Sequence, residues 1–188
     1  MSQALAQLTP DQAILVISAI LTLSFLLPVT RRPPREDESA HNFYQAQAQK
    51  ELKRLGKLKT QRRRLEHLRG VHHFVFEEMI LTALRRRRHR IQRNERYTGD
   101  GGIDGQVKIK RKLYLIQAKR YSNHISPAHV RDFAEVCRRH RKPGLFIHTG
   151  KTSAQSREIA SEGNVEIISG RRLTRIFLKP RTRGLERI

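Results

Sequence analysis

The uneven distribution of charge along this chain constrains its fold more than any other feature. Residues 1–30 contain no Lys or Arg and a single acid, Asp11, whereas the following 158 residues contain all 39 Lys and Arg against 16 acids. An apolar amino-terminal segment therefore precedes a strongly basic part that is long enough for one domain with a hydrophobic core. The cationic excess excludes an ordinary neutral metabolic enzyme and favours an anionic partner.

Residues 13–29 (AILVISAILTLSFLLPV) predict a helix that spans a membrane once. At 1.5 Å per residue these 17 residues extend roughly 26 Å, close to the hydrocarbon thickness of a bilayer. Arg31, Arg32 and Arg35 follow directly, so the positive-inside rule places the carboxyl side in the cytoplasm. We expect residues 1–30 to anchor the chain in the inner (cytoplasmic) membrane, amino terminus outside. A buried helix and a signal peptide are the alternatives, although no cation precedes the segment.

Residues 31–70 predict a linker followed by a basic helix. Residues 31–40 (RRPPREDESA) combine prolines with mixed charge, which is typical of an extended linker. Residues 44–70 carry leucines at approximately helical spacing among many Lys and Arg residues, which predicts one basic amphipathic helix. Such a helix either contacts anionic lipid or nucleic-acid phosphate, or forms a solvated stalk.

Residues 71–188 predict a single domain of the α/β class, with a mixed sheet flanked by helices. The glycine-rich stretch at residues 97–105 (YTGDGGIDG) interrupts the regular elements. Ser126 followed by Pro127 marks a helix start, and Cys137 falls on the apolar stripe of that helix, which indicates a core thiol. The expected helices run from residue 74 into residues 85–88, from Pro127 through at least Cys137, and over residues 154–161 and 171–178. The expected strands lie around Ile91 and at residues 103–109, 113–119, 144–149 and 165–168.

The two strands at residues 103–109 and 113–119 predict a hairpin whose register can be worked out. A connection with an even residue count places Asp104 opposite Gln117, with Ile103, Val107 and Ile109 facing the core. An odd count would bury the Asp104 carboxylate without a partner, which is costly. Gln117 and Lys119 share one strand face, so we expect an acid, an amide and a lysine to converge on one patch.

An acid, an amide oxygen and a lysine together suit phosphodiester hydrolysis. Carboxylate and amide oxygens are ligands that Mg²⁺ accepts, and a neighbouring Lys119 would stabilise negative charge on a phosphate. The alternative is an exposed strand face on which Asp104 and Lys119 form a local salt bridge. These three residues alone do not decide between the two interpretations.

Longer motifs around these residues resemble a known family. The chain carries Phe76-Glu77-Glu78, then GDGGID at residues 99–104, QAKRY at residues 117–121, FIHTG at residues 146–150 and IISG at residues 167–170. In this order they resemble the Mrr-type restriction endonucleases of the PD-(D/E)xK nuclease superfamily. The resemblance covers approximately residues 74–178 and implies a restriction-endonuclease-like fold.

The resemblance implies a role for each residue of the patch. Asp104 would bind Mg²⁺ or Mn²⁺, Gln117 would replace the superfamily's second acid, Lys119 would be the catalytic lysine, and Glu77 would complete the metal site. Glu78 is the alternative to Glu77, because adjacent helix residues point about 100° apart and only one can face the metal. Asp100 is explained by turn chemistry before two glycines, with a contact to DNA or metal as the alternative.

We therefore expect a membrane-anchored, metal-dependent DNA endonuclease of the restriction type. Double-stranded DNA and the membrane are the expected partners, with a homodimer as a further candidate. The rival functions are a non-catalytic membrane tether for DNA and a resolvase or repair nuclease acting on branched DNA. The residues expected to contact DNA are Arg120, Tyr121, Arg131, Lys151 and Ser153.

Overall fold

The computed structural model of the chain describes residues 36–94 and 101–178. The predicted membrane segment and Asp100 lie outside these ranges. Within the two described ranges, no helix combines the length and the hydrophobicity needed to cross a membrane.

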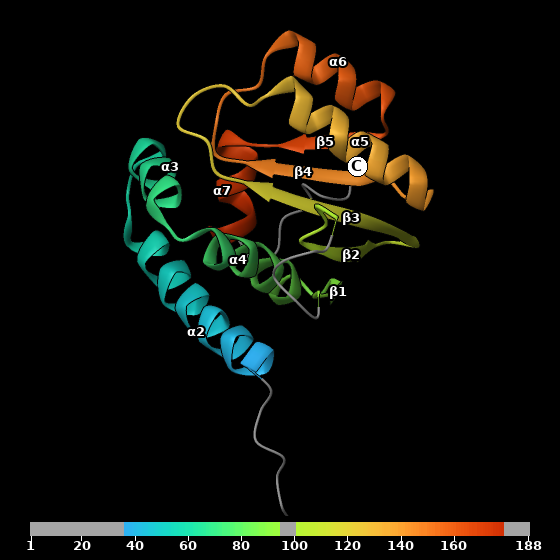
Figure 1. Ribbon diagram of the computed structural model, residues 1–188. Coiled ribbons are helices and arrows are strands. Elements are labelled where there is room, and N and C mark those ends of the chain that lie inside the picture. The colour runs from blue at the N-terminus through green and yellow to red at the C-terminus, as the bar shows by residue number, and fades with distance from the viewer. Residues whose placement is uncertain (1–35, 95–100, 179–188) are drawn as a thin grey trace, which may run out of the picture. The chain divides into compact units, whose positions relative to one another are not determined.

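A mixed sheet of five strands forms the centre of the described structure (Figure 1). The strands are adjacent in chain order, antiparallel from β1 to β3 and parallel from β3 to β5. The predicted α/β class is confirmed, because the parallel strands are joined through helices as the sequence pattern indicated. The strands are β1 (Arg90–Gln92), β2 (Gly105–Ile109), β3 (Lys112–Lys119), β4 (Gly144–His148) and β5 (Val165–Ile168).

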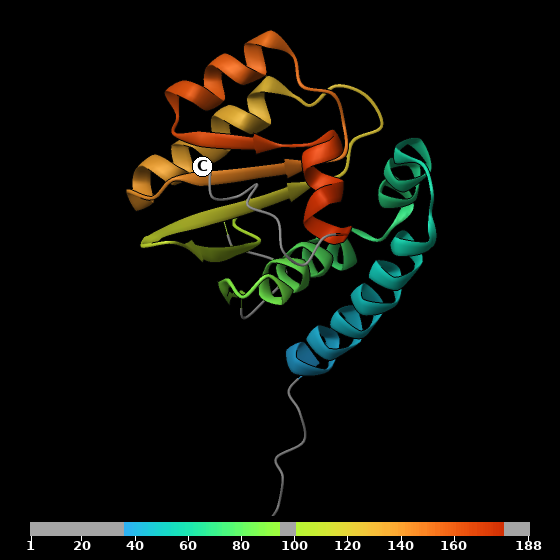
Figure 2. The same cartoon turned by 180° about the vertical axis from the view of Figure 1, so that it is seen from behind.

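Helices cover both faces of this sheet (Figures 1 and 2). One apolar cluster joins four of the helices to side chains such as Val107 and Ile116, and a second joins the other two to Leu115 and Phe146. Because Leu115 and Ile116 are adjacent in one strand, the clusters lie on opposite faces. The first group comprises α2 (Glu36–Lys57), α3 (Gln61–Gly70), α4 (His73–Arg86) and α7 (Gly170–Leu178), and the second comprises α5 (Pro127–His140) and α6 (Ala154–Glu162).

The predicted single helix over residues 44–70 is wrong, because the chain forms two helices there. Helix α2 ends at Lys57, and Thr60 caps α3 by accepting a hydrogen bond from the Arg63 amide at 3.3 Å. Leu55 and Leu68 are fully buried in the first cluster. Residues 36–70 therefore pack into the same core as the elements that follow them, which a solvated stalk would not do.

One prediction about the strand faces also needs correction. Val107 and Ile109 face the first cluster as expected, but Ile103 packs in the second cluster with Leu115. The change of face occurs next to Gly105, whose φ of +156° is a backbone conformation that side-chain-bearing residues rarely adopt. A Cβ atom at Gly105 would also lie 2.8 Å from Leu81 Cδ2, so this position requires glycine.

The helix that follows the hairpin starts and packs almost as predicted. Ser126 occupies the N-cap position before Pro127, but its side chain makes no capping hydrogen bond, so the proline rather than the hydroxyl marks the start. Cys137 is buried on the core side of α5, and burial raises the pKa of its thiol to about 12. The predicted core thiol is confirmed.

Truncating one leucine of α2 tests whether this helix belongs to the core. We expect Leu55→Ala to lower the free energy of unfolding by roughly 2–5 kcal/mol, because it leaves a cavity where a fully buried side chain packs. Phe43→Ala is the matched control on the same helix, since that ring is 57% exposed and its loss should cost little. Urea denaturation of the two variants measures the difference; equal effects would contradict the packing of α2.

Candidate functional site

The β2–β3 hairpin has the register that the sequence pattern indicated. Ile109 pairs with Lys112 across a two-residue turn, and the pairing continues to Gly105 opposite Ile116. The even connection is therefore confirmed. Asp104 lies just beyond the last pair of this ladder, and it is not paired with Gln117.

Asp104 is held against β3 by its main chain and its side chain. Its amide donates to the Ile116 carbonyl at 2.8 Å, and its carboxylate Oδ2 accepts from the Ala118 amide at 2.6 Å. A side-chain oxygen thus accepts from a strand amide just beyond the last main-chain pair of β2. Its position is fixed by the β3 backbone rather than by another side chain.

Gln117 presents a buried acceptor at the same place. Its Oε1 atom is inaccessible to solvent and accepts no hydrogen bond from any residue that the structure describes. Its Nε2 atom lies close to Gly102, where an added Cβ would come within 3.0 Å of that nitrogen. A buried amide oxygen without a donor loses its hydration without compensation, so its position suits a cation or an incoming polar group.

Lys119 follows Gln117 on the same strand face and is half-buried. Within residues 36–94 and 101–178, no ion pair joins it to Asp104. The alternative interpretation of these residues as a local salt bridge is therefore not what the structure shows. Gln117 directly precedes Ala118, whose amide holds the Asp104 carboxylate, and Lys119 directly follows Ala118 on β3.

The two glutamates of α4 have different surroundings. Glu78 is buried, and its Oε2 accepts from Arg93 Nε at 2.8 Å, so this carboxylate neutralises a partly buried guanidinium. Glu77 is half-buried on a different side of the helix. The ion pair of Glu78 leaves Glu77 as the candidate for the metal site.

Contacts at both ends of α4 place Glu77 along the sheet. His73 is close enough to Arg120, the residue after β3, for that charge to contribute to lowering the His73 pKa, after burial and the neighbouring His72. Two turns further along, Leu81 lies against Gly105, which pairs with Ile116. Glu77 lies between these two contacts on the helix, one turn before Leu81.

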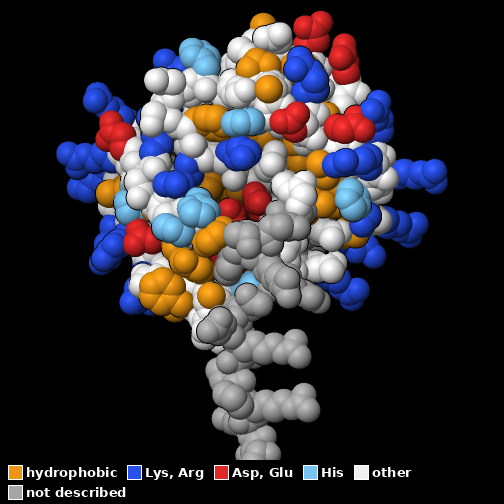
Figure 3. Space-filling model, in the orientation of Figure 1, with side chains coloured by type: hydrophobic (Ala, Val, Ile, Leu, Met, Phe, Trp, Pro, Cys, Tyr) orange, Lys and Arg blue, Asp and Glu red, His pale blue; other side chains and the backbone are white. Residues whose placement is uncertain are grey.

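Acidic side chains appear in a hollow near the middle of one face of the molecule (Figure 3). Lys, Arg and His side chains border this hollow, while most other cations project from the periphery. Such a border attracts polyanions electrostatically, and the acids at the centre provide oxygen ligands for a cation.

Three predicted DNA-contacting residues, Tyr121, Lys151 and Ser153, gather where β3 and β4 end. Tyr121 exchanges two hydrogen bonds with Thr149, its amide donating to Oγ1 at 2.8 Å and its carbonyl accepting from that hydroxyl at 2.9 Å. Exposed Lys151 extends the parallel pairing through a bridge to His124. Ser153 caps α6 by accepting from the Ser156 amide at 3.1 Å.

Arg120 serves the packing of helices on the sheet. Its Nη1 donates to the carbonyls of Arg69, at 3.1 Å, and Val71 in the connection between α3 and α4. Arg69 in turn donates from Nε and Nη2 to the Thr149 carbonyl, at 3.3 and 3.1 Å. These two arginines therefore fasten α3 to the carboxyl ends of β3 and β4.

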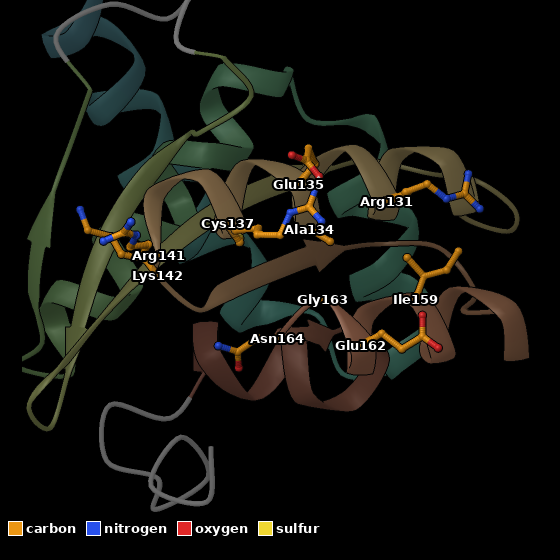
Figure 4. A pocket seen from close by; sticks show the side chains of 11 residues that line it. Arg131, Ala134, Glu135, Cys137, Arg141, Lys142, Ile159, Glu162, Gly163 and Asn164 are labelled. Atoms are coloured by element: carbon orange, nitrogen blue, oxygen red, sulfur yellow. Dashed lines mark hydrogen bonds and ion pairs between the residues drawn. The ribbon is translucent and has the colours of Figure 1, made fainter.

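Arg131 lies apart from the other candidate residues. It is exposed on α5 and lines a hollow between α5 and α6 (Figure 4). In that view Arg131 stands at one end of the hollow, with Arg141 and Lys142 at the other end. None of the other predicted site residues lines this hollow.

His148 is a site neighbour that the sequence did not single out. It pairs with Lys119 in the β3–β4 register, is fully buried, and accepts from the Gly150 amide at Nδ1, 3.1 Å away. Its Nε2 lies 3.1 Å from Thr152 Oγ1, and as Nδ1 is an acceptor, Nε2 carries the proton of the neutral ring. The available signal was a single polar residue in an otherwise apolar strand.

The side chains around Asp104 fit a hard divalent cation. Asp104 and Gln117 offer a carboxylate and an unsatisfied amide oxygen from neighbouring positions, and Glu77 is the further acid that the family resemblance indicates. Oxygen ligands with one or two carboxylates are what Mg²⁺ and Mn²⁺ use in phosphate chemistry. Groups of three or more His, Cys, Asp or Glu side chains suited to a metal do not occur among the described residues, so any site depends on the amide.

A comparison with protein families decides the classification. The family model Mrr_cat, described as a restriction endonuclease, matches residues 68–177, more than half of the chain. The chain belongs to this restriction endonuclease family. Over residues 68–177, this match confirms the resemblance of the sequence motifs and the restriction-endonuclease-like fold class. The match begins at residue 68, so α4, the whole sheet, α5 and α6 belong to the Mrr_cat region, with α7 up to residue 177.

Solved structures give weaker likenesses. The MspJI restriction endonuclease in complex with a 27-mer oligonucleotide is 22% identical over 80% of this chain and 34% of that chain, with a TM-score of 0.43. SfsA of Pyrococcus furiosus in complex with Ca²⁺ is 18% identical over 50% of this chain and 54% of that chain, with a TM-score of 0.35. This chain thus spans about a third to a half of either structure. No match was found among curated proteins.

The buried imidazole of His148 predicts a pH dependence of stability. Burial lowers the His148 pKa to about 4 from an ordinary value of 6.5, so folding holds the ring neutral. The contribution of the neutral ring to the free energy of unfolding is fully present above pH 6.5 and is lost as the pH falls toward 4. Between pH 7 and pH 5 the loss is about 2 kcal/mol. Urea denaturation should show a smaller loss over this interval in His148→Gln.

His140→Gln is the control for this experiment, because it removes a histidine that is exposed on α5. An identical pH dependence in wild type and His148→Gln would contradict the buried neutral ring.

Proposed function

We propose that this protein is a membrane-anchored, divalent-metal-dependent DNA endonuclease that hydrolyses phosphodiester bonds. Membership of the Mrr_cat restriction endonuclease family supports the nuclease part of this proposal. The apolar segment at residues 13–29 and the arginines after it support a single membrane anchor with the nuclease domain in the cytoplasm.

One observation supports a catalytic site more than any other. The Asp104 carboxylate accepts a hydrogen bond from the Ala118 amide, and the preceding residue, Gln117, has a buried Oε1 without a donor among the described residues. A protein that only bound DNA would gain nothing from desolvating this amide oxygen beside a carboxylate. A metal-binding nuclease needs oxygen ligands at this position.

Asp104, Glu77 and Gln117 would hold the cation, either Mg²⁺ or Mn²⁺. Such an ion supplies charge stabilisation for the phosphate and makes water more acidic at neutral pH. Gln117 adds no charge, so the two carboxylates provide the whole negative charge of this ligand set. We expect affinity for the ion to depend mainly on Asp104 and Glu77.

Lys119 is the residue that we propose to act on the phosphate. It lies on the same face of β3 as Gln117 and is half-buried, which supports a role for its ammonium group beside the proposed ligands. The ammonium would stabilise the negative charge that develops on the scissile phosphate as water attacks. Asp104 remains oriented throughout, because the Ala118 amide holds one of its oxygens.

Double-stranded DNA is the proposed substrate. The net charge of +22 favours a polyanion, and phosphate contacts by lysine and arginine bind duplex without regard to sequence. Exposed Lys151 and half-buried Tyr121 at the carboxyl ends of β3 and β4 are the proposed contacts nearest the site. Arg131, on α5, would contact a more distant part of the duplex.

Nicking of supercoiled plasmid tests the proposal. Wild type should nick with Mg²⁺ or Mn²⁺ and not with EDTA, and Asp104→Asn and Lys119→Ala should each reduce the rate by roughly a hundredfold or more, since each removes a charge that acts on the reacting phosphate or the metal. Agarose gel electrophoresis measures the rates.

Lys112→Ala is the matched control, because it removes an exposed lysine at the opposite end of the same strand. Tight DNA binding without cleavage under every metal condition would contradict the proposal and indicate a non-catalytic tether. A rate on branched DNA far above that on linear duplex would instead indicate a resolvase or repair nuclease.

A further inference from the structure

Five aromatic and histidine rings form a contiguous group beside the proposed active site. Phe43 contacts Tyr44, with ring centroids 5.3 Å apart, and Tyr44 stacks on His72 at 5.4 Å with an interplanar angle of 4°. His73 lies 4.2 Å from His72 and 4.0 Å from Phe74. We call these five residues the aromatic platform.

The aromatic platform is accessible to a ligand. Phe43 is 57% exposed and is the exposed large hydrophobic side chain of the described residues; His72 and His73 are also exposed. Figure 3 shows hydrophobic and His side chains next to each other on the part of this face formed by α2 and α4. Exposing a phenylalanine beside two histidines costs hydrophobic free energy, which a binding role would explain.

A groove of about 610 Å³ runs along the aromatic platform between α2 and the α3–α4 connection. Phe43, Tyr44 and His72 line one part of it, and Glu51 and His67 line another. The Glu51 carboxylate accepts from Arg54 at 2.8 Å and lies 2.7 Å from His67 Nε2. The groove thus combines ring faces with polar side chains.

This combination suits a nucleobase better than a lipid chain. A flat heterocycle can stack on the rings while its edge meets hydrogen-bonding groups, whereas an acyl chain gains nothing from a nearby carboxylate. Desolvation, with the neighbouring His72 and Arg120, lowers the pKa of His73 below its ordinary value, which favours a neutral ring at pH 7. The surrounding positive charge of the chain would retain the phosphates of the same strand.

The position of the aromatic platform relates it to the proposed cleavage site. His73 lies on α4 one helical turn before Glu77, about 6 Å along the helix axis. A strand whose phosphate lies at Glu77 and Asp104 therefore passes within a nucleotide or two of these rings. Bases inside a duplex are stacked on each other and cannot reach them, so only unpaired bases can stack there.

We infer that the aromatic platform binds an unpaired nucleobase of the DNA that the proposed nuclease cleaves. The inference rests on the proposed function for the identity of the ligand. It predicts that the protein prefers duplexes with bulged or otherwise unpaired nucleotides over perfect duplexes. Stacking, rather than phosphate contact, provides this preference.

Binding of labelled oligonucleotides to the full-length chain in EDTA tests the inference. One duplex is perfect, and the other carries a three-nucleotide bulge containing 2-aminopurine. We expect roughly tenfold tighter binding of the bulged duplex, with quenching of the 2-aminopurine as it stacks. Fluorescence anisotropy gives the affinities and emission intensity reports stacking.

Phe43→Ala/His72→Ala should abolish both the preference and the quenching. Neither change removes packing that the fold needs, because both side chains are exposed and His72 makes no capping hydrogen bond for α4. Phe43→Trp should retain the preference, since it keeps a stacking ring. His140→Ala, which removes an exposed histidine of α5, should behave as wild type.

Equal affinity of wild type for both duplexes, or a preference that persists in the double variant, would overturn the inference. Phosphatidylserine vesicles provide the other comparison: vesicle binding that requires Phe43 while the DNA preference does not would assign the aromatic platform to the membrane. Because EDTA excludes cleavage, the result is independent of plasmid nicking. A bulge preference without nuclease activity would leave this inference standing and refute only the proposed function.

Discussion

The candidate site depends on how the pairing of β2 with β3 ends. The main-chain pairs run from the two-residue turn to Gly105 opposite Ile116, and beyond that point the Asp104 carboxylate accepts from the Ala118 amide. This replacement brings a negative charge to the strand that carries Gln117 and Lys119. It also requires Gly105, since Leu81 of α4 fills the space of a Cβ there. The packing of α4 on the sheet and the position of the Asp104 carboxylate therefore depend on the same short segment, Asp104 and Gly105.

Some of the many arginines stabilise the fold and are not available to bind a polyanion. Three arginines donate to main-chain carbonyls far away in the chain: Arg69 to Thr149, Arg87 to Ile176, and Arg120 to Val71. Each of these bonds joins one element to the end of another, so these side chains stabilise the fold. The exposed cations that remain, among them Lys151 and Arg131, are available to phosphates. A charge-based account of DNA binding should therefore count exposed side chains rather than the net charge.

Local sequence patterns predicted most elements and the hairpin register, because alternation and a two-residue connection are encoded within a few residues. They did not predict that α2 packs into the core, since the partners of Leu55 come from helices distant in the chain. The break between α2 and α3 was missed for a related reason, as packing rather than leucine spacing sets the helix ends. The ion pair that distinguishes Glu78 from Glu77 could not be predicted from the sequence, because Arg93, the partner of Glu78, lies beyond the end of the helix.

The central claim is that Asp104, Glu77 and Gln117 form a site for a divalent cation, and Mn²⁺ binding tests it most directly. Isothermal titration calorimetry of the full-length chain should detect binding without any DNA. We expect Asp104→Asn and Glu77→Gln each to weaken the affinity by at least about tenfold, and Asp132→Asn, which changes an exposed acid of α5, to leave it unaltered. Equal affinity in all four proteins, or no binding by the wild type, would contradict the claim.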